Sequence, residues 1–181
     1  MVQLDGHRLT PEILYNLGAA SSTIRLSKDA LENVKKAREV IADVVDNDRT
    51  VYGITTGFGY FSTVKISNAE IRQLQYNLVR SHASGVGDPL SNDKVRRIMA
   101  VKINDLARGF SGISAESLER YVAIFNAGCV PYVPEQGTVG ASGDLAPLSH
   151  IALGLIGEGK MWNPTSQKFE KAGDVLKQHN V

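Results

Sequence analysis

The apolar positions of this chain recur mainly at helical spacing. From Ser27 onward they fall every three or four residues and form one stripe: Leu31, Val34, Ala37, Ile41, Val44 and Val45. Ser27 precedes this stripe as a favoured N-cap residue, so a helix is predicted to begin there. Ser67 and Glu70 have capping-box spacing, and the apolar positions after them continue the periodicity. This second helix is predicted to deliver His82 to its C-terminal end.

Three later segments show the same periodicity. Helices are predicted over residues 91–109 and 114–128, each opened by a serine and closed by a glycine. A further helix is predicted over residues 144–156, directly after a glycine-rich segment. Beyond Gly157 the sequence is polar, with one weak helical segment near its end.

The N-terminal residues have a different pattern. Val2–Leu4 and His7–Leu9 flank Asp5-Gly6, a pair suited to a tight hairpin turn, so a small β-hairpin is predicted there. A threonine cap followed by Pro11 predicts a short helix after it. The predicted fold is mainly α, with a small N-terminal β-hairpin.

Composition narrows the class of protein. The chain has 181 residues, with 20 Lys and Arg against 19 Asp and Glu, a net charge of +1 that argues against nucleic-acid binding. Apolar residues make up 43%, as in ordinary folded domains, and the length fits one domain. Ile151–Ile156 is too short to span a membrane, and the N-terminus lacks a secretory pattern. We therefore expect a cytoplasmic protein. One cysteine, Cys129, and scattered histidines give no metal signature.

The segment from Gly137 to Asp144 is the strongest candidate for chemistry, because it places small residues before a helix N-terminus. A P-loop requires a lysine after its glycine, where this chain has Asp144. A dinucleotide loop requires GxGxxG after a strand, and this segment reads GxxGxxG. Ser142 as the nucleophile of a hydrolase departs from GxSxG at Asp144. Two alternatives stay open: such a hydrolase, and a helical interaction module in which the glycines only shape a capping turn.

The tripeptide Ala141-Ser142-Gly143 has a more specific possibility. Gly143 keeps its backbone nitrogen accessible, so that nitrogen can attack the carbonyl carbon of Ala141 and close a five-membered ring. Loss of water from the ring, and of the Ser142 hydroxyl with its α-hydrogen, would leave a methylene conjugated to carbonyl and imine. The product would be an electrophile built from the backbone.

The residues around this tripeptide resemble a known family. Residues 137–150 are similar to the signature of the aromatic amino-acid ammonia-lyases, whose Ala-Ser-Gly becomes a 4-methylidene-imidazol-5-one group. Residues 51–59 resemble the family's active-site loop, and residues 77–87 resemble its substrate-side segment. Ser81-His82 and the run through Gly159–Trp162 are most similar to the members that act on histidine. The resemblance implies the N-terminal lobe of the family's helical, fumarase/aspartase-like fold.

The resemblance also implies roles for individual residues. Ala141, Ser142 and Gly143 would be the electrophile precursor, Tyr52 the base that removes the substrate's β-proton, and His82 a contact for the substrate imidazole. The implied reaction is removal of ammonia from L-histidine to give trans-urocanate, in histidine catabolism, without an external cofactor. Tyrosine- or phenylalanine-specific lyases and aminomutases of the same family remain alternatives.

Elementary chemistry sets conditions on these roles. A tyrosine hydroxyl has a reference pKa of about 10, so Tyr52 would need its phenolate stabilised, for which nearby helix N-termini are suited. Without the family, Tyr52 would be interpreted as a packed aromatic and His82 as a cap at a helix end. His150, within an apolar helix, is expected to be a hydrogen-bonded core or interface side chain.

Family members are several hundred residues long and act as homotetramers. Residues 1–181 correspond to a single N-terminal lobe, without the C-terminal helical bundle, its substrate-carboxylate arginine and its other polar active-site groups. We therefore expect a catalytically inactive fragment whose Ala-Ser-Gly loop stays uncyclised. Apolar stripes that normally join the bundle predict self-association.

Overall fold

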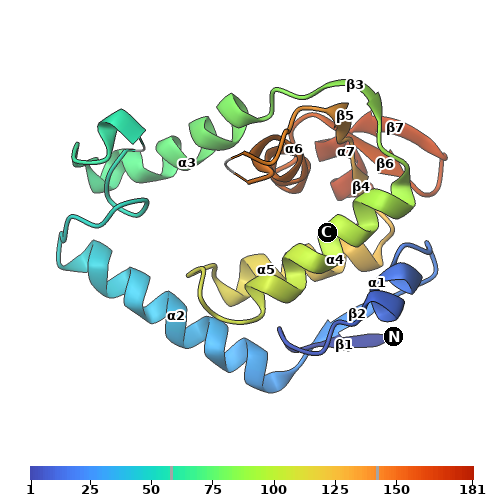
Figure 1. The fold of residues 1–181 in the computed structure, drawn as a ribbon, viewed down its shortest axis with the longest axis horizontal. Helices are drawn as coiled ribbons and strands as arrows, with labels where there is room; N and C mark the ends of the chain where they lie inside the picture. Colours follow the sequence, from blue (N-terminus) through green and yellow to red (C-terminus); the bar gives the residue numbers. More distant parts are fainter. Residues whose placement is uncertain (58, 142) are drawn as a thin grey trace.

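The helices begin at the residues that the sequence indicates. The computed structural model describes residues 1–57, 59–141 and 143–181, and it is mainly helical (Figure 1). Its helices are α1 (Pro11–Leu17), α2 (Lys28–Asp46), α3 (Asn68–His82), α4 (Asn92–Leu106), α5 (Ala115–Asn126), α6 (Leu145–Leu155) and α7 (Ala172–Gln178). The predicted fold class is confirmed.

Serine and threonine caps fix several of these starts. The Ser27 hydroxyl accepts a hydrogen bond from the Ala30 amide at 3.1 Å, and Ser114 does the same for Ser117 at 3.1 Å. Ser67 differs, because its side chain does not bond to a backbone amide and donates to the Glu70 carboxylate at 2.6 Å. The capping-box spacing predicted the position of α3 correctly, but the reciprocal cap is not formed.

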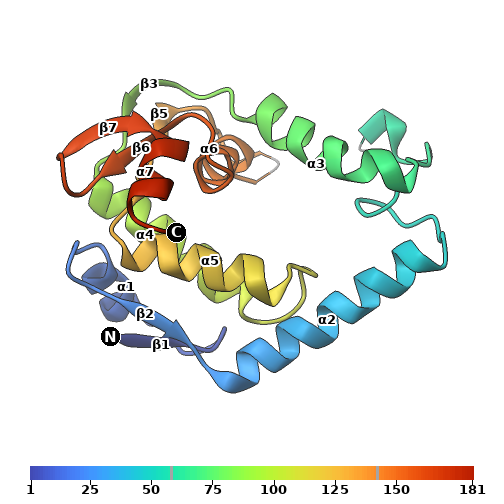
Figure 2. The same cartoon turned by 180° about the vertical axis from the view of Figure 1, so that it is seen from behind.

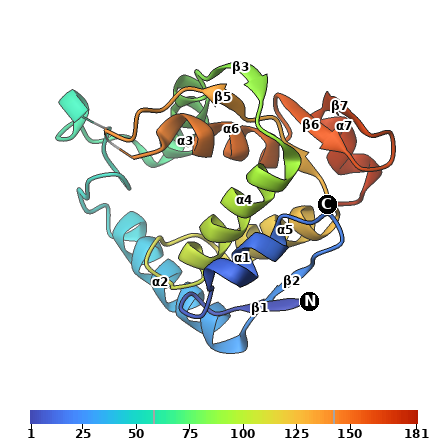
Figure 3. The same ribbon diagram turned by 45° about the vertical axis from the view of Figure 1, so that its right-hand side comes forward.

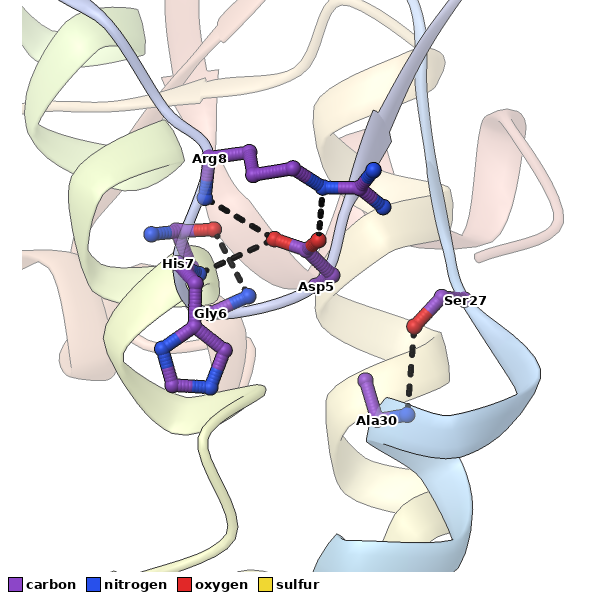
Figure 4. Close-up of polar contacts among 7 residues, drawn as sticks. Asp5, Gly6, His7, Arg8, Ser27 and Ala30 are labelled. Atoms are coloured by element: carbon purple, nitrogen blue, oxygen red, sulfur yellow. Dashed lines mark hydrogen bonds and ion pairs between the residues drawn. The ribbon is translucent and has the colours of Figure 1, made fainter.

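The predicted N-terminal hairpin is wrong. Strand β1 (Val2–Leu4) pairs in parallel with β2 (Ile24–Leu26), in register Val2 with Ile24, and residues 7–9 are not a strand. The reason is the side chain of Asp5, which accepts hydrogen bonds from the amides of His7 and Arg8 at 2.9 and 3.0 Å (Figure 4). These amides are therefore turned toward Asp5 and away from a partner strand.

The described residues contain five further strands, all of them after α3. β3 (Val86–Pro89) pairs antiparallel with β5 (Pro134–Gln136). A separate antiparallel sheet has the order β4 (Val130–Pro131), β6 (Lys160–Asn163) and β7 (Lys168–Lys171). The predicted helix near the end is present as α7, whereas the β6–β7 hairpin was not predicted from the sequence.

The core lies around α4 and α5. Figures 1 and 2 show these helices between the N-terminal elements and the part formed by α6 and the C-terminal sheet. Met99, Ile103, Leu118 and Phe125 are fully buried there. Arg96 is also buried. Its guanidinium donates to the carbonyls of Phe125 and Ser22, and these hydrogen bonds offset the cost of burying a charge.

Helices α2 and α3 are arranged differently. Figures 1 and 3 show α2 extending from the N-terminal elements and α3 lying beside α6, with which it is in contact; the segment that contains Tyr52 joins the two helices. None of the described side chains of α3 is fully buried. Within the described ranges, no helix combines the length and apolar character needed to cross a bilayer.

Candidate active site

The glycine-rich loop reaches the surface immediately before α6. Ala141 and Gly143 are exposed, while Ser142 lies outside the described residues. Gly140 and Gly143 have φ angles of +71° and +85°, and a side chain at either position would meet no atom within 4 Å. Glycine is therefore required there by the left-handed backbone and not by crowding.

Thr138 holds the two ends of this loop together. Its hydroxyl accepts a hydrogen bond from the Gly140 amide at 3.2 Å and lies 3.1 Å from the Asp144 carboxylate, to which it donates. The same hydroxyl is 3.4 Å from the carbonyl oxygen of Gly143. Thr138 was not predicted as a site residue, although a hydroxyl residue two positions before a left-handed glycine is a signal for such a local contact.

The described part of the tripeptide fits ring closure. Ala141 and Gly143 are partners in an isolated β-bridge. Gly143 has no Cβ and faces open space, which leaves its nitrogen unobstructed by a side chain. These features suit a condensation between residues 141 and 143.

His82 is the last residue of α3, as predicted. Its Nδ1 lies 2.9 Å from the Leu78 carbonyl oxygen, which only accepts, so Nδ1 carries the proton in this contact. In the neutral ring Nε2 is then the acceptor. A partly buried imidazole at a helix C-terminus with a defined acceptor is suited to bind an N–H group of a ligand.

The segment after His82 contacts the start of the glycine-rich loop. A Cβ on Gly137 would lie 2.9 Å from the Cα of Gly85, so the two chains approach at a distance that excludes a side chain at residue 137. Val86 is the β-sheet partner of Gln136. The structure therefore brings together two of the three blocks singled out by the sequence, residues 77–87 and 137–150.

The third block forms the turn after α2. The amides of Ile54 and Thr55 both donate to the carbonyl of Val51, and Thr55 and Thr56 are buried. Tyr52 itself is 62% exposed. Gly53 and Ile54 border a cavity of about 540 Å³ together with residues of α2 and α3. Tyr52 thus lies at the surface of a turn that its neighbours fix.

His150 and Cys129 are explained by their surroundings. The Nε2 of His150 accepts a hydrogen bond from the Gly85 amide at 3.0 Å, which confirms the expected hydrogen-bonded role. Burial lowers the pKa of His150, which favours the neutral ring needed as an acceptor. Burial raises the pKa of the Cys129 thiol to about 11, so this thiol is a poor nucleophile.

Comparison with known proteins identifies the family. The family described as aromatic amino acid lyase matches residues 9–181. The chain belongs to the aromatic amino acid lyase family. Human histidine ammonia-lyase is 54% identical over 99% of this chain, and that match takes up 27% of the human protein.

Solved structures of family members agree with the fold. The crystal structure of histidine ammonia-lyase from Trypanosoma cruzi matches 99% of the chain with a TM-score of 0.92 and 46% identity, over 34% of its own length. A tyrosine aminomutase from Streptomyces globisporus matches with a TM-score of 0.91 and 34% identity, over 33% of its length. The chain therefore spans about a quarter to a third of these relatives, and it corresponds to their N-terminal part.

Proposed function

We propose that the complete protein containing this chain is a histidine ammonia-lyase, which removes ammonia from L-histidine to give trans-urocanate. The single observation that carries this proposal is the contact between two blocks of the chain. The exposed loop with Ala141 and Gly143 lies against the segment that follows His82, through Gly137 and Gly85. An electrophile precursor and an imidazole-binding side chain thus lie on neighbouring segments.

The tripeptide would hold the prosthetic group. Ala141, Ser142 and Gly143 are the residues that would form 4-methylidene-imidazol-5-one. When formed, this group supplies an electrophile that draws electron density from the substrate amine and makes ammonia a better leaving group. The bridge between Ala141 and Gly143 and the open space around Gly143 support this assignment. Thr138 keeps the loop closed around the tripeptide.

His82 would orient the substrate. With Nδ1 directed to the carbonyl of Leu78, its Nε2 can accept an N–H from the imidazole of L-histidine. This contact fixes the ring of the substrate and leaves its α-amino and β-carbon groups free to meet the reacting residues. An aliphatic residue at position 82 would lack that acceptor, so the polar side chain favours histidine over phenylalanine as substrate.

Tyr52 would act as the general base. Its phenolate oxygen takes a proton from the β-carbon of the substrate while the bond to the amino group breaks. The exposure of Tyr52 in this chain supports access to a ligand, since the turn around it holds its backbone and leaves the ring at the surface.

The chain alone does not carry the whole proposed site. We propose that residues 1–181 form one N-terminal lobe, that a C-terminal helical bundle supplies the arginine for the substrate carboxylate, and that the active enzyme is a cytoplasmic homotetramer. The share of the relatives that the chain spans supports this view. On this proposal the 181 residues by themselves are inactive, keep an uncyclised loop and self-associate.

One alternative has a specific observation in its favour. The similarity to a tyrosine aminomutase, at 34% identity, means that the fold of this lobe also serves a different reaction. An aminomutase would return a β-amino acid, and a tyrosine- or phenylalanine-specific lyase would release the corresponding aryl acrylate. The products therefore separate these reactions.

The test is the complete protein incubated with L-histidine, L-tyrosine and L-phenylalanine. We expect urocanate and ammonia from L-histidine, little product from the other two, and a raised KM with residual turnover in His82→Leu. Formation of a β-amino acid, or preference for L-phenylalanine, would refute the assignment. Labelling of Ser142 by a serine-directed phosphonate would instead favour a hydrolase, and no reaction with any of these reagents would favour an interaction module.

A further inference from the structure

Two polar contacts flank His82 and join its segment to α6 and the turn after it. On one side, Arg80 forms a two-bond ion pair with Glu158, with N–O distances of 2.9 and 2.5 Å. On the other, the Gly85 amide donates to His150 at 3.0 Å. Glu158 lies just after α6 and His150 lies within it. Helix α6 begins directly after the Ala-Ser-Gly loop. The helix and the turn that follows it therefore connect this loop to the residues on both sides of His82.

The contact at Gly85 is the more enclosed of the two. Arg80 is exposed and Glu158 is partly exposed, and an ion pair at the surface contributes little. Gly85 is enclosed, because a Cβ there would lie 3.1 Å from His150 Nε2, 3.1 Å from the Gln136 carbonyl oxygen and 3.2 Å from the Pro134 Cβ. Its amide donates to the ring of His150, and removal of that acceptor would leave a partly buried donor without this bond.

We propose that His150 is a positioning residue, which holds the Gly85 amide and thereby fixes His82 relative to the Ala-Ser-Gly loop. The consequence for substrate binding rests on the proposed function. His150 touches neither substrate nor reacting atoms and acts through the two residues between His82 and Gly85. Its effect is therefore on the orientation of the His82 ring and on substrate affinity, and not on formation of the electrophile.

The acceptor role requires a neutral ring. A protonated His150 has N–H groups at both nitrogens, so its Nε2 can no longer accept from Gly85. The charged and titratable groups that share its surroundings are Tyr132, Glu158 and Lys160, which line a cavity of about 250 Å³ with it, and Arg80 through its pair with Glu158. Burial lowers the pKa of His150, so the contact is present at neutral pH and is lost as the pH falls through that lowered value.

The first test uses the 181-residue chain and needs no activity. Amide hydrogen exchange at Gly85 and the ring resonances of His82 are measured by NMR in wild type, His150→Leu and His150→Gln. We expect exchange at Gly85 to be roughly fivefold faster in His150→Leu, as for loss of one hydrogen bond, with shifted His82 resonances. In His150→Gln the side-chain carbonyl can accept, so both readouts return toward wild type.

His179→Leu is the matched control. His179 is also partly buried and makes one ring hydrogen bond, from Nε2 to Asn163 at 3.0 Å. We expect this variant to leave Gly85 and His82 unchanged. Faster exchange at Gly85 without any shift at His82, or equal effects from His179→Leu, would overturn the positioning role. Because His150→Gln retains an acceptor, it keeps the test decisive even where His150→Leu fails to fold.

The second test uses the complete protein and L-histidine. We expect His150→Leu to raise KM about tenfold with a much smaller change in kcat and an unchanged loss of two waters. In a His82→Leu background the same substitution should raise KM no further, because its effect passes through His82. Additive effects would overturn the proposal. Absence of urocanate from wild type would refute the proposed function instead, and the NMR experiment would still decide the positioning role.

Discussion

At the residue scale, the hydroxyl of Thr138 is the contact that closes the glycine-rich loop. It accepts from the Gly140 amide and lies within reach of the Asp144 carboxylate and the Gly143 carbonyl. A side chain that bridges both sides of residues 141–143 reduces the conformations that the tripeptide can sample. Local order of this kind favours an intramolecular reaction, since the reacting atoms are held near each other.

A pair of substitutions tests this effect in the complete protein. Thr138→Val keeps the shape of the side chain and removes the hydroxyl, so we expect loss of the two waters to slow about tenfold. Thr138→Ser retains the hydroxyl and should cyclise at close to the wild-type rate. The measurement is intact mass against time after synthesis. Equal rates in both variants would show that the hydroxyl has no part in ring closure.

The turn at Asp5 gives a prediction about acid stability. Hydrogen bonds from the amides of His7 and Arg8 hold the pKa of Asp5 well below its usual range (Figure 4). The contribution is present above the unfolded-state pKa, about 3.9, and is lost as the pH falls below it. We expect Asp5→Asn to unfold with a weaker pH dependence than wild type between about pH 4 and 2. An unchanged slope in chemical denaturation would contradict this assignment.

The sequence predicted the structural positions of individual residues best where neighbouring residues determine the local backbone. His82 at the end of a helix and the small residues at 140–143 follow from caps, periodicity and glycine content. Thr138 and the bond from Gly85 to His150 were not predicted. The second contact joins residues 65 positions apart, and no local pattern records such a meeting.

At the scale of elements, α2 and α3 both begin after a serine, but the two serines make different contacts. Ser27 is buried and accepts from the Ala30 amide, whereas Ser67 is exposed and bonds only to a side chain. We expect Ser27→Ala to lower the free energy of unfolding by about 1 kcal/mol, and Ser67→Ala by about 0.5 kcal/mol or less. Thermal or urea unfolding of the two variants measures this difference. Equal losses would mean that the bond from the Ala30 amide to Ser27 adds no more stability than the side-chain contact of Ser67.

Helices were predictable from the sequence, whereas among the strands only β1 was, and its partner was not. Most helices here carry a serine or threonine before a stripe of apolar residues, which is a local signal. The strands have two to four residues each, too few to show alternation, and β1 pairs with a strand more than twenty positions away. The Asp5-Gly6 pair did form a turn, with Gly6 at φ +87°. The amides of the next two residues, however, bond to the Asp5 side chain and do not pair with β1.

At the scale of the whole molecule, the arrangement of α2 and α3 bears on association. Helix α3 lies beside α6 (Figure 1), but the described part of α3 has no fully buried side chain although its sequence carries an apolar stripe. Partly exposed apolar surface of this kind favours self-association. We expect the 181-residue chain to show a concentration-dependent mass in analytical ultracentrifugation. A monomer at all concentrations would contradict this expectation.

The central claim is that Ala141, Ser142 and Gly143 condense into the electrophile of the complete enzyme, and the mass of the peptide that contains them tests it most directly. We predict that this peptide, from the active complete protein, weighs two waters less than its sequence, and that Ser142→Ala abolishes both this loss and turnover. A peptide of full mass in a protein that still releases ammonia from L-histidine would contradict the account.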